Sequence, residues 1–260
     1  MRIFTVLISF MVTATYTLNA SALNLENTLW QVKKVHPDVD SGRRMIYGEN
    51  DPRLVGRFLQ LNKNNIESDL PDFFDCKLPD YQKQKLALDE WVKRATGIAE
   101  TTGAKAWRLN VRGSDIVTTF TVHCQTGMFD GGGYGEYGAM IAQLSPAEII
   151  INWGETTLVE LNPVNKNDIK PSFDCGKAQA ESEKAICADY RLSSLDKSVF
   201  DAWRVAKALA KDVANTELLA TVIASQKAWL MNRNQCGSDP QCLAKSMTER
   251  MEKLAETQNE

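Results

Sequence analysis

The sequence predicts an α+β protein, in which an antiparallel barrel-like β domain with one short helix precedes a small disulfide-linked bundle of α-helices. Between residues 23 and 161, short apolar runs are separated by turn residues, a pattern typical of an antiparallel barrel or sandwich. After residue 172 the apolar residues recur every three or four positions, as on one face of a helix. The chain has 6 cysteines, an even number that predicts disulfides in an exported protein.

The first 22 residues are expected to form a cleaved signal peptide. Arg2 gives a positively charged start, residues 3–14 are largely apolar, and the Ala-Ser-Ala of residues 20–22 fits a cleavage site. No cysteine follows that site, so a lipoprotein anchor is not predicted. No later apolar run reaches the ~20 residues that a transmembrane helix needs. We therefore expect a periplasmic or secreted protein without a membrane span.

The composition narrows the classes of function. The formal net charge is -3, whereas nucleic-acid binding needs a basic face, so no nucleic-acid partner is expected. The chain has 2 histidines, His36 and His123, and no pair of cysteines with the short spacing of a zinc site. His123 precedes Cys124, but neighbouring residues on a strand point to opposite faces of the sheet. These observations predict a protein that is not an enzyme and uses neither a metal nor a cofactor.

The barrel-like domain is predicted over residues 23–161. The expected strands are residues 28–35, 43–47, 54–61, 66–70, 107–111, 116–124, 138–144, 149–153 and 157–161. A helix is predicted over residues 81–99, because apolar residues fall there at helical spacing among charged ones. Cys76 precedes this helix and Cys124 ends a strand after it. Pairing them would tie the helical excursion to the barrel and contribute roughly 3 to 4 kcal/mol.

A linker is predicted at residues 162–172, where prolines and a polar run interrupt the apolar pattern. The helical domain follows over residues 173–260. Its apolar stripes predict a short helix near residues 182–186 and three longer helices. The expected N-terminal caps of the longer helices are Ser193, then Asn215 or Thr216, and finally Asp239 before Pro240.

Four of the cysteines lie in the helical domain, which allows three pairings. Antiparallel packing of the two longer helices would bring Cys187 close to Cys236, and Cys175 could then reach Cys242. We prefer this arrangement. The alternative is the pairing of Cys175 with Cys187.

Residues 131–138 form a glycine-rich segment that also contains Tyr134 and Tyr137. The segment lacks the lysine and hydroxyl residue of a phosphate-binding loop, so we expect a loop at the barrel mouth. Aromatic side chains on a flexible backbone are common in recognition loops. Tyr134 and Tyr137 are therefore candidate partner-contact residues.

The helical domain also carries motif elements in a fixed order. They are Phe-Asp-Cys, Glu-Lys-x-Ile-Cys, Leu-x-x-Leu-Asp and Gln-x-x-Trp-x-x-x-Arg-x-x-Cys. Their principal residues are Phe173, Asp174, Cys175, Glu183, Cys187, Leu192, Asp196, Gln226, Trp229, Arg233 and Cys236. In order and spacing these elements resemble the domain that names the LprI family of lysozyme inhibitors. The resemblance covers residues 171–254, about a third of the chain.

The resemblance implies a protein that inhibits lysozyme in the bacterial envelope and so protects peptidoglycan. No inhibitory residue of the family can be mapped here, and the motif residues are expected to stabilise the fold. The first domain lies outside the resemblance and is similar in predicted architecture to lipocalins. Binding of a small apolar ligand inside the barrel is therefore the alternative function. A hydrolase is less favoured, because no catalytic constellation is evident.

Overall fold

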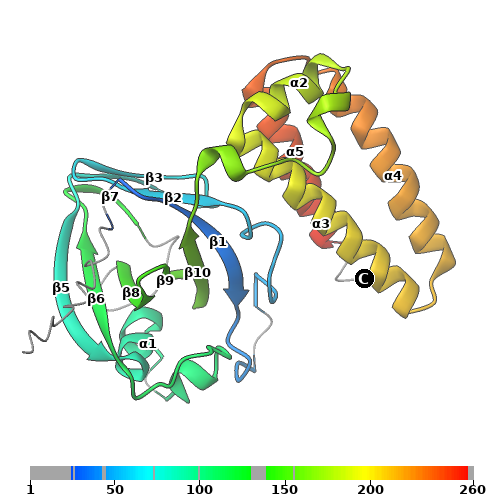
Figure 1. The fold of residues 1–260 in the computed structure, drawn as a ribbon. Coiled ribbons are helices and arrows are strands. Elements are labelled where there is room, and N and C mark those ends of the chain that lie inside the picture. The colour runs from blue at the N-terminus through cyan, green and yellow to red at the C-terminus, as the bar shows by residue number, and fades with distance from the viewer. Residues whose placement is uncertain are drawn as a thin grey trace, which may run out of the picture.

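The computed structural model describes residues 25, 27–42, 45–72, 74–98, 100–129, 139–154 and 156–256. In these residues a curled antiparallel sheet precedes a group of helices (Figure 1), which confirms the predicted α+β fold. The expected signal peptide and the glycine-rich segment with Tyr134 and Tyr137 lie outside the described residues. No helix in the described part of the chain is both long and apolar enough to cross a bilayer.

The sheet contains ten described strands. Their bounds are β1 Leu29–His36, β2 Phe58–Leu61, β3 Asn65–Ser68, β4 Phe74–Lys77, β5 Asp80–Ala87, β6 Ile116–His123, β7 Thr126–Met128, β8 Ala139–Ser145, β9 Glu148–Trp153 and β10 Thr157–Pro163. The order in the sheet is β5-β6-β8-β9-β10-β1-β2-β3-β4-β7. Most neighbours are consecutive in sequence, so the sheet is largely a meander, and β10 returns to pair with β1.

The two ends of this order are joined along the chain. Lys77 of β4 pairs with Thr126 of β7, and Asp80 of β5 pairs with His123 of β6. Only two residues separate β4 from β5, and two separate β6 from β7. β4 therefore continues into β5, and β6 continues into β7, so the four strands form one long antiparallel ribbon that bends at a corner. The sheet as a whole curls into a barrel-like shape (Figure 1).

A disulfide between Cys76 and Cys124 lies at this corner, as predicted. Cys76 is fully buried, and the Gln125 N–H donates to the Lys77 carbonyl beside the bond. The sequence separation is 48 residues. Closing a loop of that length contributes about 4 kcal/mol in the chain-entropy model.

Both faces of the central strands are buried. One face, with Trp30, Val32, Ile151 and Trp153, fills the inside of the curl. The opposite face of β8, β9 and β10 packs against helix α1 (Leu88–Thr96). Burial on both faces explains why these strands read as continuous apolar runs.

The predicted helix over residues 81–99 is wrong in its first half. Residues Asp80–Ala87 form strand β5, which pairs with β6 along its whole length, and α1 begins at Leu88. The polar run at residues 82–85 carries no apolar stripe, so sheet pairing decides its conformation. Strands β4 and β7 were not expected, because they are too short to show an alternating pattern.

Two other predicted strands are also wrong. Of the predicted strand 43–47, residues 43–44 lie outside the described residues and residues 45–47 form no strand. Tyr47 is buried, with the Arg53 guanidinium 4.8 Å from its ring centroid. Residues 107–111 form a turn and an irregular segment, in which Trp107 Nε1 donates to the Thr156 carbonyl at 2.8 Å. Both aromatic side chains pack into the core from loops, a role that periodicity does not distinguish from a strand position.

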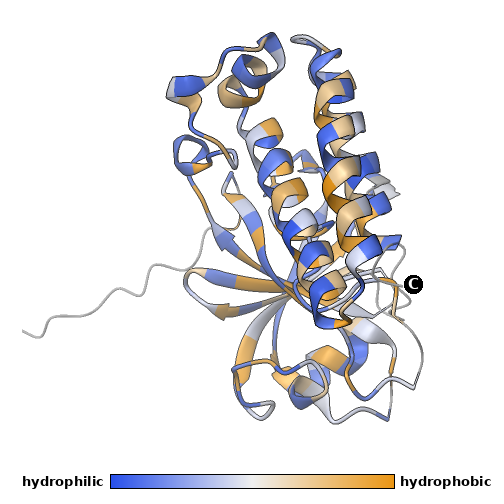
Figure 2. Ribbon diagram, turned by 90° about the vertical axis from the view of Figure 1, so that its right-hand side faces the viewer, coloured by the Kyte–Doolittle hydropathy of each residue, from blue (hydrophilic) through white to orange (hydrophobic). Residues whose placement is uncertain are grey.

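The helical module consists of α2 Glu181–Ala188, α3 Tyr190–Asp212, α4 Thr216–Asn234 and α5 Pro240–Glu256. Figure 2 shows hydrophobic and hydrophilic residues alternating along these helices. Their apolar faces meet in one core around Leu192, Val199, Val222, Leu243 and Met247.

The caps of the module are partly as predicted. Asn215 accepts from the Leu218 N–H, and Asp239 accepts from the N–H groups of the first turn of α5. The expected Ser193 cap is wrong. Asp189 caps α3 instead, while Ser193 Oγ donates to the Ile186 carbonyl.

The preferred disulfide pairing of the module is also wrong. Cys175 bonds Cys187, and Cys236 bonds Cys242. The first bond joins a 3-10 turn to the end of α2, and the second brackets the turn between α4 and α5. Each bond therefore closes a local turn, and antiparallel packing of α3 and α4 does not require a bond between them.

Replacing Cys236 and Cys242 together by serine should lower the free energy of unfolding by about 2 kcal/mol, because the bond closes a separation of only 6 residues. Urea unfolding followed by circular dichroism measures the change. The Cys175→Ser, Cys187→Ser variant is the matched control and should lose slightly more, since its loop spans 12 residues. A module that unfolds completely in the first variant would contradict this expectation.

Candidate functional site

Two of the motif residues, Asp196 and Arg233, form a buried ion pair in the helical module. Arg233 Nη1 donates to Asp196 Oδ1 at 3.0 Å, and the two side chains are 4% and 6% exposed. Asp196 Oδ2 accepts from both the N–H and the hydroxyl of Ser172, at 2.8 and 2.6 Å. Burial lowers the pKa of Arg233, and Asp196 counteracts this by favouring the charged form. The network ties the segment before α2 to α3 and α4.

The other motif residues are structural as well. Glu183 accepts from the N–H groups of Gln179 and Ala180, which lowers its pKa below the ordinary range. Asp174 accepts from the Gly176 N–H. Trp229 Nε1 donates to Ser246, Gln226 Oε1 accepts from Arg250, and Phe173 packs against the module core. None of these contacts leaves the module, so the motif describes how the module folds.

Helix α3 packs directly on the barrel-like domain through two serines. Ser194 Oγ donates to the Gly56 carbonyl at 2.7 Å and accepts from Gln31 Nε2 at 3.1 Å. Ser198 Oγ donates to the Val55 carbonyl at 2.9 Å and accepts from Arg57 Nη2 at 2.9 Å. These contacts join residues more than a hundred positions apart in the sequence, and they form an interface between the helical module and the barrel-like domain.

Arg57 and Asp69 form an ion pair beside this interface. Nη1 of Arg57 lies 3.9 Å from Oδ2 of Asp69. Burial lowers the pKa of the Arg57 guanidinium and raises that of the Asp69 carboxyl, although each group favours the charged form of the other. Phe58 packs edge-on against Tyr190 nearby, with ring centroids 5.1 Å apart. The junction between α3 and the barrel-like domain therefore combines hydrogen bonds, an ion pair and an aromatic contact.

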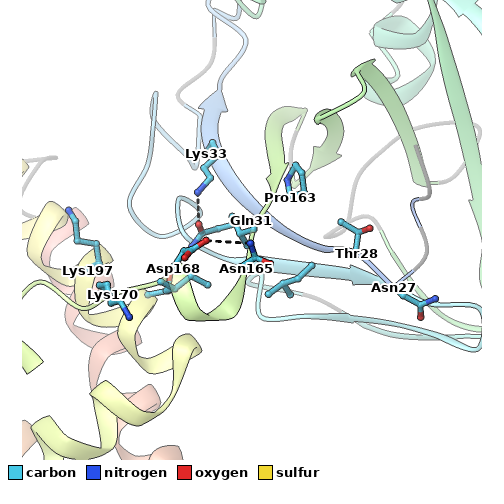
Figure 3. A pocket seen from close by; sticks show the side chains of 13 residues that line it. Asn27, Thr28, Gln31, Lys33, Pro163, Asn165, Asp168, Lys170 and Lys197 are labelled. Atoms are coloured by element: carbon cyan, nitrogen blue, oxygen red, sulfur yellow. Dashed lines mark hydrogen bonds between the residues drawn. The ribbon is translucent and has the colours of Figure 1, made fainter. Parts of the chain in front are cut away.

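A cleft of about 700 Å³ opens at this junction (Figure 3). Its lining combines β1, the end of β10, the segment before α2 and helix α3. The lining residues are Asn27, Thr28, Leu29, Gln31, Lys33, Pro163, Val164, Asn165, Asp168, Ile169, Lys170, Ser194 and Lys197. The cleft contains three lysines and one aspartate, so it is positively charged. We call it the junction cleft.

A second concavity of about 360 Å³ lies between α3 and α4. Its lining is mostly apolar and consists of Ser172, Asp196, Val199, Phe200, Trp203, Lys207, Ile223, Gln226, Lys227, Trp229 and Leu230. Trp203 Nε1 has no hydrogen-bond partner among the described residues, and Lys207 Nζ lies 3.8 Å from the centroid of the Trp203 ring. We call this concavity the helical groove.

Neither concavity lies inside the curled sheet. There, the side chains of Trp30, Leu61, Ile141, Trp153 and Val159 are buried against one another. Packing of this kind weighs against the alternative function, in which the barrel interior holds a small apolar ligand.

The histidines do not form a catalytic constellation with each other. His36 Nε2 lies 3.3 Å from Glu160 Oε2, and Lys34 binds the same carboxylate. His36 and Lys34 lower the pKa of Glu160. His123 is exposed at the end of β6. In the described part of the chain, no cluster of three or more His, Cys, Asp or Glu side chains is placed to hold a metal ion.

Comparison with protein-family models, curated proteins and solved structures finds no match to this chain. The resemblance to the LprI family therefore rests on the motif residues of the helical module. Sequence reasoning did not find Gln31, Gly56 or Ser194 at the junction. The available signal was the spacing of Ser194 and Ser198, which places two hydroxyls on the same face of the helix.

Proposed function

We propose that this chain is an exported binding protein that inhibits lysozyme and performs no chemistry of its own. The observation that carries the proposal is the buried network around Asp196 and Arg233. The network joins Asp196 of the third motif element, Arg233 of the fourth, and Ser172, which directly precedes the first. Motif elements that are far apart in the sequence are therefore in contact in the folded module. Three disulfides fit the oxidising environment of an exported protein.

The helical groove is the contact surface that we assign to this function. Protein interfaces depend on buried aromatic and aliphatic anchors, and the groove presents Phe200, Trp203 and Leu230 together. Lys207 and Lys227 line it, so it offers no charge complementarity to a basic lysozyme. The negative net charge of the whole chain would assist the encounter, while the groove supplies apolar contact.

The purified chain from Leu23 onward should inhibit lysozyme at micromolar concentration in a cell-wall lysis assay. Leu230→Asp should weaken inhibition at least tenfold, because it places a carboxylate in an apolar contact, which corresponds to ~1.4 kcal/mol or more. Met231→Asp is the matched control. Met231 is the next residue on α4, is 66% exposed and does not line the groove, whereas Leu230 is 38% exposed.

Far-ultraviolet circular dichroism must show the same helix content in both variants. Absence of inhibition by the unmodified chain at micromolar concentration would refute the proposed function. Equal inhibition by the two variants would refute the assignment to the groove while leaving the activity in place.

A further inference from the structure

Hydrogen bonds from Gln31 hold one side of the junction cleft in place. Gln31 lines it with 9% of its surface exposed, and its amide donates to both Ser194 Oγ and the Gly56 carbonyl. Gln31 Oε1 accepts from Lys33 Nζ at 2.6 Å, so the same side chain also orients a lysine (Figure 3). Because this side of the cleft is held by buried hydrogen bonds, a ligand would meet a preorganised surface.

The charges in the cleft are unbalanced. Lys33, Lys170 and Lys197 line it together with Asp168. Lys197 is paired with Asp201 at 2.6 Å, outside the lining. Within the described part of the chain, neither Lys33 nor Lys170 forms an ion pair with a carboxylate. The two remaining ammonium groups are therefore available to an anion.

The rest of the lining suits a polar ligand. Asn27, Thr28 and Asn165 offer amide and hydroxyl groups, and Leu29 and Ile169 add apolar surface. This mixture is appropriate for a sugar ring, which has hydroxyl groups at its edge and C–H groups on its faces. A volume of about 700 Å³ lies within the ~300–1,000 Å³ range of small-molecule sites.

We propose that the junction cleft binds an acidic saccharide, with Lys33 and Lys170 supplying the positive charge that favours its carboxylate. Burial lowers the pKa of Lys33 in the free protein. A carboxylate bound in the cleft would favour the charged form of this ammonium group. This site is separate from the helical groove, and it does not depend on the proposed inhibition of lysozyme.

The test is a titration of the ¹⁵N-labelled chain from Leu23 onward, followed by nuclear magnetic resonance at neutral pH. The probes are N-acetylmuramic acid and N-acetylglucosamine, which differ by a carboxylate-bearing lactyl group. The acidic sugar should shift the amide signals of Leu29 and Ile169 and bind at least tenfold more tightly than the neutral one. Inorganic phosphate is a third probe and should bind more weakly than the acidic sugar.

Lys170→Gln should weaken binding of N-acetylmuramic acid at least fivefold, and Lys33→Gln should do the same. Lys170 is exposed, so its substitution does not threaten folding. Lys177→Gln is the control, because Lys177 is 84% exposed and lies outside the cleft. Equal affinity for the two sugars, no binding at millimolar concentration, or full affinity in Lys170→Gln would overturn the proposal. Phosphate binding as tight as that of the acidic sugar would overturn the assignment to a saccharide.

Discussion

Asp196→Ala should lower the free energy of unfolding by about 3–5 kcal/mol. The substitution removes the acceptor of Arg233 Nη1 and of both Ser172 donors, and it leaves a guanidinium that is 4% exposed without its countercharge. Breaking one side of a buried ion pair costs this much because the remaining charge stays desolvated. Chemical denaturation at neutral pH, with linear extrapolation to water, measures the loss.

Asp201→Ala is the matched control for this prediction. Asp201 lies on the same helix and binds Lys197 and Arg204, but at the surface of the module. An exposed pair contributes at most ~1 kcal/mol, so the control should be close to neutral. A double variant, Asp196→Leu with Arg233→Met, should recover much of the loss, because it removes both charges. Similar losses from Asp196→Ala and Asp201→Ala would show that the network does not stabilise the module.

Gly56→Ala should lower the free energy of unfolding by ~2–5 kcal/mol. Gly56 has φ +89°, a conformation that is unfavourable for a residue with a Cβ by roughly 1–2 kcal/mol. A Cβ there would lie 2.8 Å from Ser194 Oγ and 3.0 Å from Ser198 Oγ, and overpacking of this kind costs typically ~1–3 kcal/mol. The clash lies at the interface between the sheet and α3, so the unfolding midpoint of the whole chain should fall.

Two further variants separate the causes. Gly42→Ala should be nearly neutral, since a Cβ at Gly42 meets no atom within 4 Å and its φ is not positive. Adding Ser194→Ala to Gly56→Ala removes the closest clash but keeps the backbone strain. The added substitution should therefore cost less in Gly56→Ala than in the unmodified chain. An unchanged cost in the two backgrounds would contradict close packing at the junction.

Local patterns predict much of this fold. Strands β6, β9 and β10 match their apolar runs within a few residues, and the helices of the module follow their apolar stripes. The errors arise where tertiary contacts override local pattern. Strand β5 is polar because part of it faces solvent, and Trp107 lies in a turn because its indole binds the Thr156 carbonyl.

The candidate sites were far less predictable. The hydrogen bond between Gln31 and Ser194 joins residues 163 positions apart, and no local pattern encodes such a contact. The helical spacing of Phe200 and Trp203 predicts that they lie on the apolar face of their helix. The spacing is correct, but both remain partly exposed in the helical groove. Periodicity gives the face of a helix on which a residue lies, and it does not show whether another element covers that face.

The three disulfides share a property that bears on how the chain becomes oxidised. Each one joins a cysteine to the next cysteine in sequence: Cys76 to Cys124, Cys175 to Cys187, and Cys236 to Cys242. Six cysteines allow 15 pairings. The native pairing is the one that an oxidase would produce by joining thiols in the order in which they leave a translocation channel. Oxidation in chain order can therefore reach the native set of bonds without any later reshuffling by an isomerase.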